Sequence, residues 1–396
     1  MQRILIFSLT YHPFVGGAEV AIKEISERCS PLEYSFDMIT LRFDSRLPRV
    51  EKMGNVTVHR IGWSVAGAKI SDRSMPLRCR VAKALFPCTA LWKAMWLHRG
   101  HRFDMAWAMM ANQAGFAGFF FTSLYPSVRY VLELQDGRPF AEMKQRRPLL
   151  RLLWPLYRRM YLSADSIKCI SYFLAGEVRL LGYAGPLEVI PNGVDVARFS
   201  RPVAPEALNK LKAHFGKESG HTFLFTASRL VLSRGVEDAI QALAHLPPSV
   251  KFLIAGEGED REKLEHIAVG AGVADRVIFA GHVSHHDLPA YFAISDIFVR
   301  ASLIEGFGNA FVESFAAGIP VVATPVGGIP DFLHDGETGL FCAVRDPASI
   351  ARAVSRYLDD PALRARIVEN ARTLVADKYD WDLIAHDMRA KIFRAV

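Results

Sequence analysis

The chain has 396 residues, of which 51% are hydrophobic and 22% are charged, and its formal net charge is +7. This length and composition exclude a disordered chain and leave room for two folded domains of about 150–200 residues each. The positive charge favours a negatively charged partner, such as a phosphate, a nucleic acid or an anionic membrane, without choosing among them.

Cysteine usage and apolar runs indicate the compartment. The cysteines are odd in number and irregularly spaced, and they form no Cys-x-x-Cys pair: Cys29, Cys79, Cys88, Cys169 and Cys342. We therefore expect reduced thiols in a cytoplasmic protein, without a disulfide framework or a zinc site. The apolar run 4–7 is too short for a signal-peptide core, and the apolar stretch 114–125 falls short of the ~20 residues of a membrane span.

Short apolar runs alternate with segments of helical spacing in the first half of the chain. Strands are expected at 4–9, 36–41, 56–61, 104–108 and 130–134, and a helix is expected at 18–29. Apolar strands separated by helices are typical of parallel sheets that are covered on both faces.

The second half repeats this rhythm. Strands are expected at 222–227, 251–255, 277–280, 297–299 and 321–323, and helices at 236–246 and 260–271. Two such halves predict two Rossmann-like α/β domains. The turn signal Pro191-Asn192-Gly193-Val194-Asp195 marks their boundary. We predict domains at 1–196 and 203–379, a linker at 196–203, and a last helix at 380–396 that returns to the first domain.

One segment after an expected strand carries the clearest functional pattern, Glu305-Gly306-Phe307-Gly308-Asn309-Ala310-Phe311-Val312-Glu313. Gly306 and Gly308 permit a tight loop whose backbone N–H groups can face a ligand, and Asn309 is a candidate cap for the helix that follows. A helix N-terminus at such a loop suits an anionic phosphate. Glu305 on the loop and Glu313 one turn inside the helix can each accept hydrogen bonds from sugar hydroxyls. The alternative is a glycine turn between two surface glutamates that binds no ligand.

This segment resembles the Glu-x7-Glu signature of the retaining glycosyltransferases of family 4. The resemblance covers nearly the whole chain and is most specific over 222–340. It implies the GT-B fold, in which the parallel sheets of two Rossmann-like domains face each other across a cleft. It also implies that Glu305 contacts the hydroxyls of the donor sugar and that Glu313 holds the ribose. The residues between them would meet the sugar and the phosphates: Gly306, Phe307, Gly308 and Asn309.

Two arginines on another strand-to-helix loop fit the same reading. Arg229 and Arg234 lie five residues apart, and guanidinium groups at such a spacing can grip a diphosphate. The family usually carries lysine where Arg234 stands, so this position keeps the charge and changes the geometry. Together with helix N-termini, the two arginines are expected to stabilise the departing diphosphate.

The first half supplies candidates for the acceptor side. His12, Gly16 and Gly17 lie on the first strand-to-helix turn, where a double glycine lets the backbone approach a ligand. The turn does not match G-x-G-x-x-G, which disfavours a nicotinamide dehydrogenase. Gln135 and Asp136 follow the last expected strand of this half, at the end where such folds bind ligands. Many family members carry histidine at the position of Gln135, and glutamine cannot act as a general base. Proton handling is then left to Asp136, to the donor phosphate or to the acceptor's own setting.

Three further positions enter through the resemblance. Asn192 lies in the interdomain crossover close to the site, while Gly256 and Val283 match the region that holds the nucleotide base. The chain's Asp-x-Asp, at 380–382, begins the last expected helix, and the adjacent residues 285–287 seldom converge on one metal. We therefore expect no metal and no cofactor beyond the donor, a UDP-, GDP- or ADP-sugar.

Two basic stretches, 73–102 and 143–161, interleave arginine and lysine with leucine and tryptophan. Either their apolar faces pack on the first sheet and the cations are solvated, or they bind an anionic membrane surface. The residues and the resemblance together predict a metal-independent hexosyltransferase that acts on a lipid-linked or cell-envelope glycan, and the resemblance implies retention of configuration. The protein is expected in the cytoplasm, and on the second reading of the basic stretches it is peripheral on the inner face of the membrane. No nucleic acid partner is expected. A GT-B sugar-nucleotide epimerase and a non-catalytic sugar-nucleotide-binding protein remain as alternatives.

Overall fold

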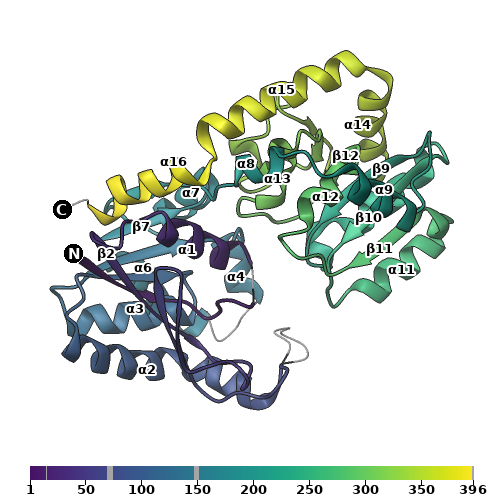
Figure 1. The fold of residues 1–396 in the computed structure, drawn as a ribbon. Helices are drawn as coiled ribbons and strands as arrows, with labels where there is room; N and C mark the ends of the chain where they lie inside the picture. Colours follow the sequence, from purple (N-terminus) through teal and green to yellow (C-terminus); the bar gives the residue numbers. More distant parts are fainter. Residues whose placement is uncertain (15, 69–74, 147–150, 395–396) are drawn as a thin grey trace. The chain divides into compact units, whose positions relative to one another are not determined.

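A computed structural model describes residues 1–14, 16–68, 75–146 and 151–394, and the chain divides into two compact units (Figure 1). Unit 1 is Met1–Asn192 with Trp381–Val396, and unit 2 is Gly193–Asp380. Within the stretch 196–203, where the sequence predicts the linker, Val196–Ser200 forms helix α8. The carboxylate of Asp195 caps this helix by accepting a 2.9 Å hydrogen bond from the Arg198 backbone N–H.

Unit 1 contains an eight-stranded sheet in the order β3-β4-β2-β1-β5-β6-β7-β8, in which only the edge strand β3 is antiparallel among the described pairs. Its strands are β1 (Gln2–Phe7), β2 (Tyr34–Leu41), β3 (Val50–Met53), β4 (Val56–Ile61), β5 (Met105–Met109), β6 (Arg129–Leu134), β7 (Ser166–Cys169) and β8 (Leu187–Val189). The sequence reading missed β3, β7 and β8. In β7 the buried Lys168 breaks the apolar run by which a central strand is recognised.

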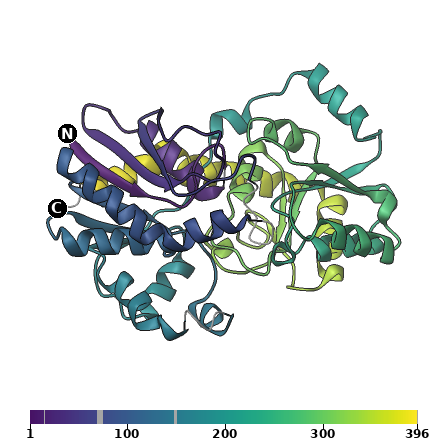
Figure 2. The same cartoon turned by 90° about the horizontal axis from the view of Figure 1, so that it is seen from below.

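The helices of unit 1 are α1 (Gly17–Glu27), α2 (Leu77–Gly100), α3 (Gln113–Leu124), α4 (Phe140–Arg146), α6 (Trp154–Leu162), α7 (Tyr172–Leu180) and α16 (Trp381–Asp387), which continues as a π-helical turn at Met388–Phe393. Helices α1 and α16 lie together on one face of the sheet, and α2 and α3 cover the other, where Figure 2 shows α2 crossing the strands. The C-terminal segment joins the first domain, as predicted, because Trp381, Ile384 and Phe393 share a core with β1, β2 and β5.

The apolar stretch 114–125 is helix α3, which is partly buried. Across the four described ranges, no helix combines the length and the hydropathy that crossing a bilayer requires.

Unit 2 contains a six-stranded parallel sheet in the order β11-β10-β9-β12-β13-β14. Its strands are β9 (Thr222–Ala227), β10 (Val250–Ala255), β11 (Val277–Gly281), β12 (Ile297–Arg300), β13 (Val321–Ala323) and β14 (Leu340–Phe341). Its helices after α8 are α9 (Pro205–His214), α10 (Val236–Ala242), α11 (Arg261–Gly270), α12 (Leu288–Ala293), α13 (Asn309–Ala317), α14 (Pro347–Asp359) and α15 (Pro361–Lys378). The sequence reading missed only the two-residue β14 among these strands.

Both sheets therefore have the Rossmann-like arrangement that the sequence predicts. In each unit the strand order reverses once, between β1 and β5 in unit 1 and between β9 and β12 in unit 2. Open α/β sheets bind ligands beyond the carboxyl ends of the strands at this point of reversal. The loops that follow β1, β9 and β12, together with the helices that begin after them, carry most of the predicted site residues.

Candidate functional site

The loop between β12 and α13 holds Glu305 in a fixed, buried position. Its Oε2 accepts hydrogen bonds from Arg300 Nη2 at 2.5 Å and from Arg234 Nη1 at 2.8 Å. The Glu305 side chain is only 7% exposed. Burial lowers the pKa of the Arg300 guanidinium to about 10, while the nearby Glu305 opposes that shift. Glu305 is therefore not the surface glutamate of a plain glycine turn.

The second carboxylate oxygen of Glu305 differs from the first. Within the described ranges, no hydrogen bond from another residue reaches Oε1. The loop is braced from two sides, by Leu303 N–H donating to Ser233 O at 2.9 Å and by Gly328 N–H donating to Glu305 O at 3.2 Å. Gly327 has a φ of 57°, and a Cβ there would lie 1.8 Å from Glu305 O. A rigid loop thus presents one carboxylate oxygen to a ligand.

Helix α13 begins directly after this loop. The prediction that Asn309 caps the helix is wrong, because Asn309 is its first helical residue and Gly308, with a φ of 93°, is the N-cap. As the N-cap, Gly308 has no side chain with which to cap the helix, and the N-terminus of a helix after a glycine loop suits an anion. Phe307 packs on Phe332 and Tyr379, at ring-centroid distances of 5.1 and 5.6 Å. Its side chain anchors the loop, which leaves its backbone for a ligand.

Glu313 lies inside α13, one turn from the helix start, as predicted. It is buried, and its Oε1 lies 2.9 Å from Nε2 of His285. The other ring nitrogen of His285 lies 3.3 Å from Arg198 Nη1, and Arg198 Nη2 donates to the His285 carbonyl. The sequence analysis missed both contacts, because their partners lie 28 positions apart (His285 and Glu313) and 87 positions apart (Arg198 and His285) and no spacing pattern connects them.

The two arginines of the β9–α10 loop have different surroundings. The Arg229 side chain is exposed and has no ion-pair partner in the part of the chain that the structure describes. Arg234 instead donates to Glu305 Oε2 and, at 3.2 Å, to the Ile304 carbonyl. The geometry thus differs between the two positions, as the sequence predicts: Arg229 is exposed, whereas Arg234 holds Glu305. That both arginines grip a diphosphate stays a prediction.

Glycines bring the neighbouring loops of unit 2 into close contact. A Cβ on Gly235, whose φ is 65°, would lie 1.7 Å from Ala301 O, and one on Gly256 would lie 1.9 Å from Ser228 O. Gly256 therefore packs the end of β10 against the loop that bears Arg229. Val283, which follows β11, is half-buried.

Metal ligands do not converge in the described residues, where no group of three His, Cys, Asp or Glu side chains is placed to hold an ion. His285 is bonded to Glu313, and His286 Nδ1 lies 3.1 Å from Asp287 Oδ1. Asp382, for which the sequence suggested helix capping, accepts a hydrogen bond from Arg28 Nε at 2.6 Å.

In unit 1, the loop after β1 contains His12 and Gly16, and Gly17 is the first residue of α1. Both glycines are exposed, and Gly16 is the N-cap of α1. Gly16 N–H donates to Glu19 Oε2 at 2.8 Å, and Thr10 donates to the other oxygen of Glu19. Burial raises the pKa of Glu19, and these hydrogen bonds oppose the shift. The helix thus caps its N-terminus with its own carboxyl group.

Gln135 and Asn192 form a reciprocal amide pair. Gln135 Nε2 donates to Asn192 Oδ1 at 3.1 Å, and Asn192 Nδ2 donates to Gln135 Oε1 at 2.9 Å. Gln135 Nε2 also donates to Glu133 Oε1 at 2.6 Å. Asp136 points elsewhere: its side chain is 54% exposed and lies 3.8 Å from Arg138 Nε. The structure therefore brings Gln135 and Asn192 together and leaves Asp136 apart.

Behind Gln135 lies a fully buried ion pair that the sequence reading missed. Lys168 Nζ donates to Glu133 Oε1 at 2.6 Å, and both side chains are 0% exposed. Trp107 Nε1 donates to the other oxygen of Glu133 at 2.9 Å. These residues lie on three adjacent strands, β5, β6 and β7. Beyond the end of β5, Met110 has a φ of 72°, a left-handed conformation that is uncommon for a side-chain-bearing residue.

Comparisons with known proteins cover both units. The model of the family "Glycosyl transferases group 1" matches residues 209–374, and that of "Glycosyltransferase Family 4" matches residues 15–198. An uncharacterized glycosyltransferase of Methanocaldococcus jannaschii is 26% identical over 98% of this chain and 96% of its own length.

Two further proteins are informative. A GDP-mannose-dependent alpha-(1-6)-phosphatidylinositol monomannoside mannosyltransferase of Mycolicibacterium smegmatis is 32% identical over 57% of this chain, which spans 61% of that protein's length. The crystal structure of Anabaena HepE in complex with UDP-glucose superposes with a TM-score of 0.79 at 19% identity, covering all of both chains. That structural likeness shows the fold.

Proposed function

Because the chain belongs to the group 1 glycosyl transferase family, we propose that it moves a hexosyl unit from a nucleoside diphosphate sugar to a hydroxyl acceptor with retention of configuration. The observation that carries this proposal is the loop beyond β12, where Glu305 presents one open oxygen beside the uncapped N-terminus of α13. Arg229 is exposed on the loop after β9, the strand next to β12.

Each group has a distinct role in this proposal. Glu305 Oε1 accepts hydrogen bonds from hydroxyls of the donor sugar, while Arg300 and Arg234 hold its other oxygen. The amides at the start of α13 and the guanidinium of Arg229 stabilise the negative charge that develops on the departing diphosphate. Glu313, held by His285, accepts hydrogen bonds from the ribose.

The acceptor proton is assigned to the departing diphosphate. Gln135 cannot act as a base, and its amide is fully engaged by Asn192 and Glu133. Asp136 is exposed and apart from that pair. As the bond between the sugar and the phosphate breaks, a phosphate oxygen accepts the proton of the attacking hydroxyl on the same face of the sugar. This arrangement is consistent with retention.

Helix α2 supports an acceptor at an anionic membrane. One of its faces packs inside unit 1 through Ala82, Phe86 and Ala90. A second apolar stripe is exposed at helical spacing, with Trp92 71% and Trp96 58% exposed: Val81, Leu85, Trp92 and Trp96. The helix carries five cations and no carboxylate: Arg78, Arg80, Lys83, Lys93 and Arg99. Packing on the sheet therefore accounts for only one of its faces, and the other suits a lipid-linked or cell-envelope acceptor at an anionic surface.

The second basic stretch, residues 143–161, gives less support to an acceptor at an anionic membrane. Lys144 Nζ lies 3.8 Å from the ring centroid of Trp154, which packs on Tyr157. The side chains of residues 145–150, and Arg73 in the first stretch, lie outside the described residues.

A thermal-shift panel of UDP-, GDP- and ADP-sugars tests the donor site. One donor should raise the melting temperature, and both Arg229→Ala and Glu313→Ala should abolish that shift. Arg366→Ala, which removes an exposed arginine from α15 in the same unit, should keep it. Unchanged donor affinity in both site variants would contradict the site assignment.

Product analysis separates transfer from the alternatives. With donor and a membrane extract, a new glycoside should form, and the rate should be the same with and without EDTA because the proposal includes no metal. An isomerised sugar nucleotide formed from donor alone would indicate an epimerase, and donor binding without turnover would indicate a binding protein.

Vesicle sedimentation tests the membrane surface. The protein should sediment with vesicles that contain phosphatidylglycerol and less with phosphatidylcholine alone. Replacing both Trp92 and Trp96 with alanine should reduce the bound fraction, whereas Leu32→Ala, at an 86% exposed position elsewhere in unit 1, should not. Equal binding by both variants would refute this surface.

A further inference from the structure

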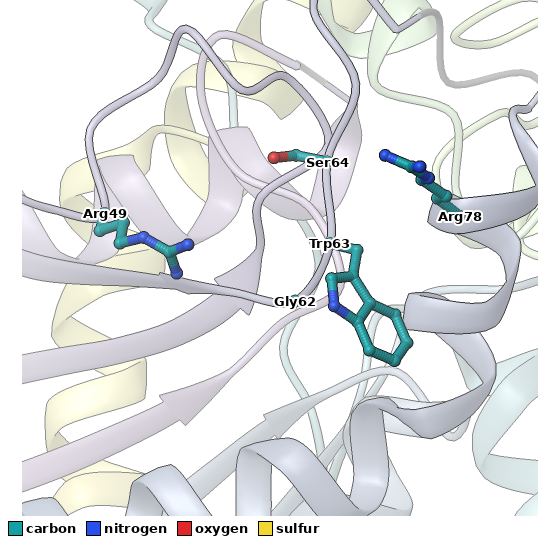
Figure 3. Close-up of a pocket in the computed structure, with 5 residues that line it drawn as sticks. All are labelled: Arg49, Gly62, Trp63, Ser64 and Arg78. Atoms are coloured by element: carbon teal, nitrogen blue, oxygen red, sulfur yellow. The ribbon is translucent and has the colours of Figure 1, made fainter.

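Unit 1 contains a concave feature that the donor assignment does not use. It is a pocket of about 490 Å³ lined by Arg49, Gly62, Trp63, Ser64 and Arg78, which we call the Trp63 pocket. Figure 3 shows the guanidinium groups of Arg49 and Arg78 reaching toward the segment 62–64 from two sides. Pockets of this volume are large enough for a small ligand.

The walls of the Trp63 pocket are formed by segments that follow two adjacent strands of the sheet, β4 and β2. Gly62 and Trp63 directly follow β4, and the segment that ends at Arg49 follows β2. Backbone hydrogen bonds join the two segments, from Arg42 N–H to Ile61 O at 2.8 Å and from Val65 N–H to Phe43 O at 3.1 Å. The pocket therefore lies at the carboxyl ends of parallel strands, the edge where such sheets bind ligands.

A buried arginine ties this pocket to the loop after β1. Arg60 is 3% exposed, and its guanidinium donates to His12 O at 2.8 Å and to Pro48 O at 3.3 Å. Its backbone N–H donates to Arg49 O at 2.7 Å. Phe14 packs edge-on against Phe43, with ring centroids 6.1 Å apart. The Trp63 pocket is thus held beside the loop that the proposed function assigns to the acceptor.

The lining side chains have the chemistry of an anion site joined to a ring-binding surface. Arg49 and Arg78 are exposed, and neither has an ion-pair partner in the described part of the chain. Two guanidinium groups can bind one phosphate through several charge-assisted hydrogen bonds. Trp63 is 59% exposed, and its indole offers an apolar face with a polar N–H, while Ser64 adds a hydroxyl. A bare anion would use only the arginines.

We propose that the Trp63 pocket binds a phosphate-bearing sugar ring, with the phosphate on Arg49 and Arg78 and the ring against Trp63. This inference rests on the proposed function and extends it: the acceptor, or the part of it next to the reacting hydroxyl, is a phosphorylated sugar. The phosphate comes either from a free sugar phosphate or from a sugar linked to lipid through phosphate.

Calorimetric titration without donor tests the pocket. The probes are glucose 6-phosphate, mannose 6-phosphate, free glucose, inorganic phosphate, and vesicles with and without phosphatidylinositol. At least one phosphate-bearing ring should bind, at least tenfold more tightly than inorganic phosphate or glucose. Binding of a soluble hexose phosphate identifies the free source, and binding of phosphatidylinositol vesicles alone identifies the lipid-linked source. Absence of binding by every phosphate-bearing ring, or equal binding of inorganic phosphate, would overturn the proposal.

Substitutions locate the binding. Arg49→Ala and Arg78→Ala should each weaken it about tenfold or more, since a hydrogen bond to a charged group contributes about 1.5–3 kcal/mol. Trp63→Ala should weaken it, and Trp63→Phe should restore part of it. Lys52→Ala, at an exposed position three residues after Arg49 and not in the pocket lining, should leave hexose phosphate binding unchanged. An equal loss in Lys52→Ala, or no loss in the pocket variants, would refute the site.

Donor thermal shift is measured on the same variants. It should be normal in all of them, because the proposed donor groups lie in unit 2. A protein that binds donor and forms glycoside but binds no phosphate-bearing ring would refute this inference alone. A protein that binds no donor would refute the proposed function.

Discussion

Each unit contains a buried glutamate that is paired with a basic side chain: Glu133 in unit 1 and Glu305 in unit 2. The two glutamates differ in how many of their carboxylate oxygens accept a hydrogen bond. In unit 1, both oxygens of Glu133 are occupied, one by Lys168 and Gln135 and the other by Trp107. In unit 2, Glu305 accepts from Arg300 and Arg234 through one oxygen, and no described residue donates to the other.

The difference separates a structural carboxylate from one that is available to a ligand. Glu133 lies on strand β6 among buried neighbours, where an unpaired charge would be strongly unfavourable. Glu305 lies on a loop where two arginines hold one of its carboxylate oxygens in place. The following predictions test whether this contrast is real, from the largest expected effect to the smallest.

Removing the cation of the saturated pair should cause the largest loss of stability. Lys168→Met leaves Glu133 buried without its partner, so we expect a loss of about 3–5 kcal/mol in the free energy of unfolding, measured by thermal and denaturant unfolding. The double variant Glu133→Gln with Lys168→Met should recover much of that loss.

The matched control is Lys23→Met, in an exposed pair with Glu27 at 4.0 Å, which should change stability by less than about 1 kcal/mol. If Lys168→Met were no worse than this control, Glu133 would not be a structural carboxylate.

Changing the open carboxylate should affect the reaction. Glu305→Gln retains an acceptor for Arg300 and loses the charge that binds the sugar hydroxyls, so kcat/KM should fall about 10- to 100-fold. Steady-state kinetics measures this on protein shown to be folded by circular dichroism. An unchanged kcat/KM would remove the contrast between the two glutamates.

A third buried carboxyl group extends the comparison to pH. Glu237 Oε2 has no hydrogen-bond partner among the described residues, and burial raises the pKa of Glu237 from 4.5 to about 7. Below pH 4.5 both the folded and the unfolded chains hold this proton. As pH rises from 4.5 to 7, the unfolded chain loses the proton first, so the stability falls, and the full deficit is present above pH 7.

Glu237→Gln should therefore stabilise the protein at pH 8 by about 1–3 kcal/mol and leave it nearly unchanged at pH 4.5, as measured by unfolding at both pH values. Equal stabilisation at both pH values would show that ionisation of Glu237 is not the cause.

The smallest effect is expected at Asp136. This side chain is 54% exposed, and its ion-pair contact with Arg138 is long, at 3.8 Å. Asp136→Asn should lower kcat by no more than about fivefold, the scale of an exposed charge interaction. A loss of several hundredfold would instead identify Asp136 as the acceptor base and overturn the assignment of that proton to the diphosphate.

The order of elements was predictable because it follows local patterns. Short apolar runs gave the strands at 56–61, 222–227 and 321–323 with their observed bounds. The places where prediction failed have tertiary causes. Strand β7 is hidden by Lys168, whose charge is compatible with the core only because Glu133 lies on the adjacent strand. Asn309 is a good cap by residue type, but Gly308, with its positive φ, takes the cap position and the helix starts one residue earlier than predicted, at Asn309.

By itself, the sequence determined the two α/β domains and the segment from Glu305 to Glu313, because apolar strand patterns and glycine loops depend on residues that are consecutive in the chain. Only the tertiary structure decided what each charged group does. It paired Arg234 and Arg300 with Glu305, His285 with Glu313, and Lys168 with Glu133. The partners in these four contacts are five to 71 positions apart in the chain. Their roles therefore depend on which strands and loops become neighbours in the fold.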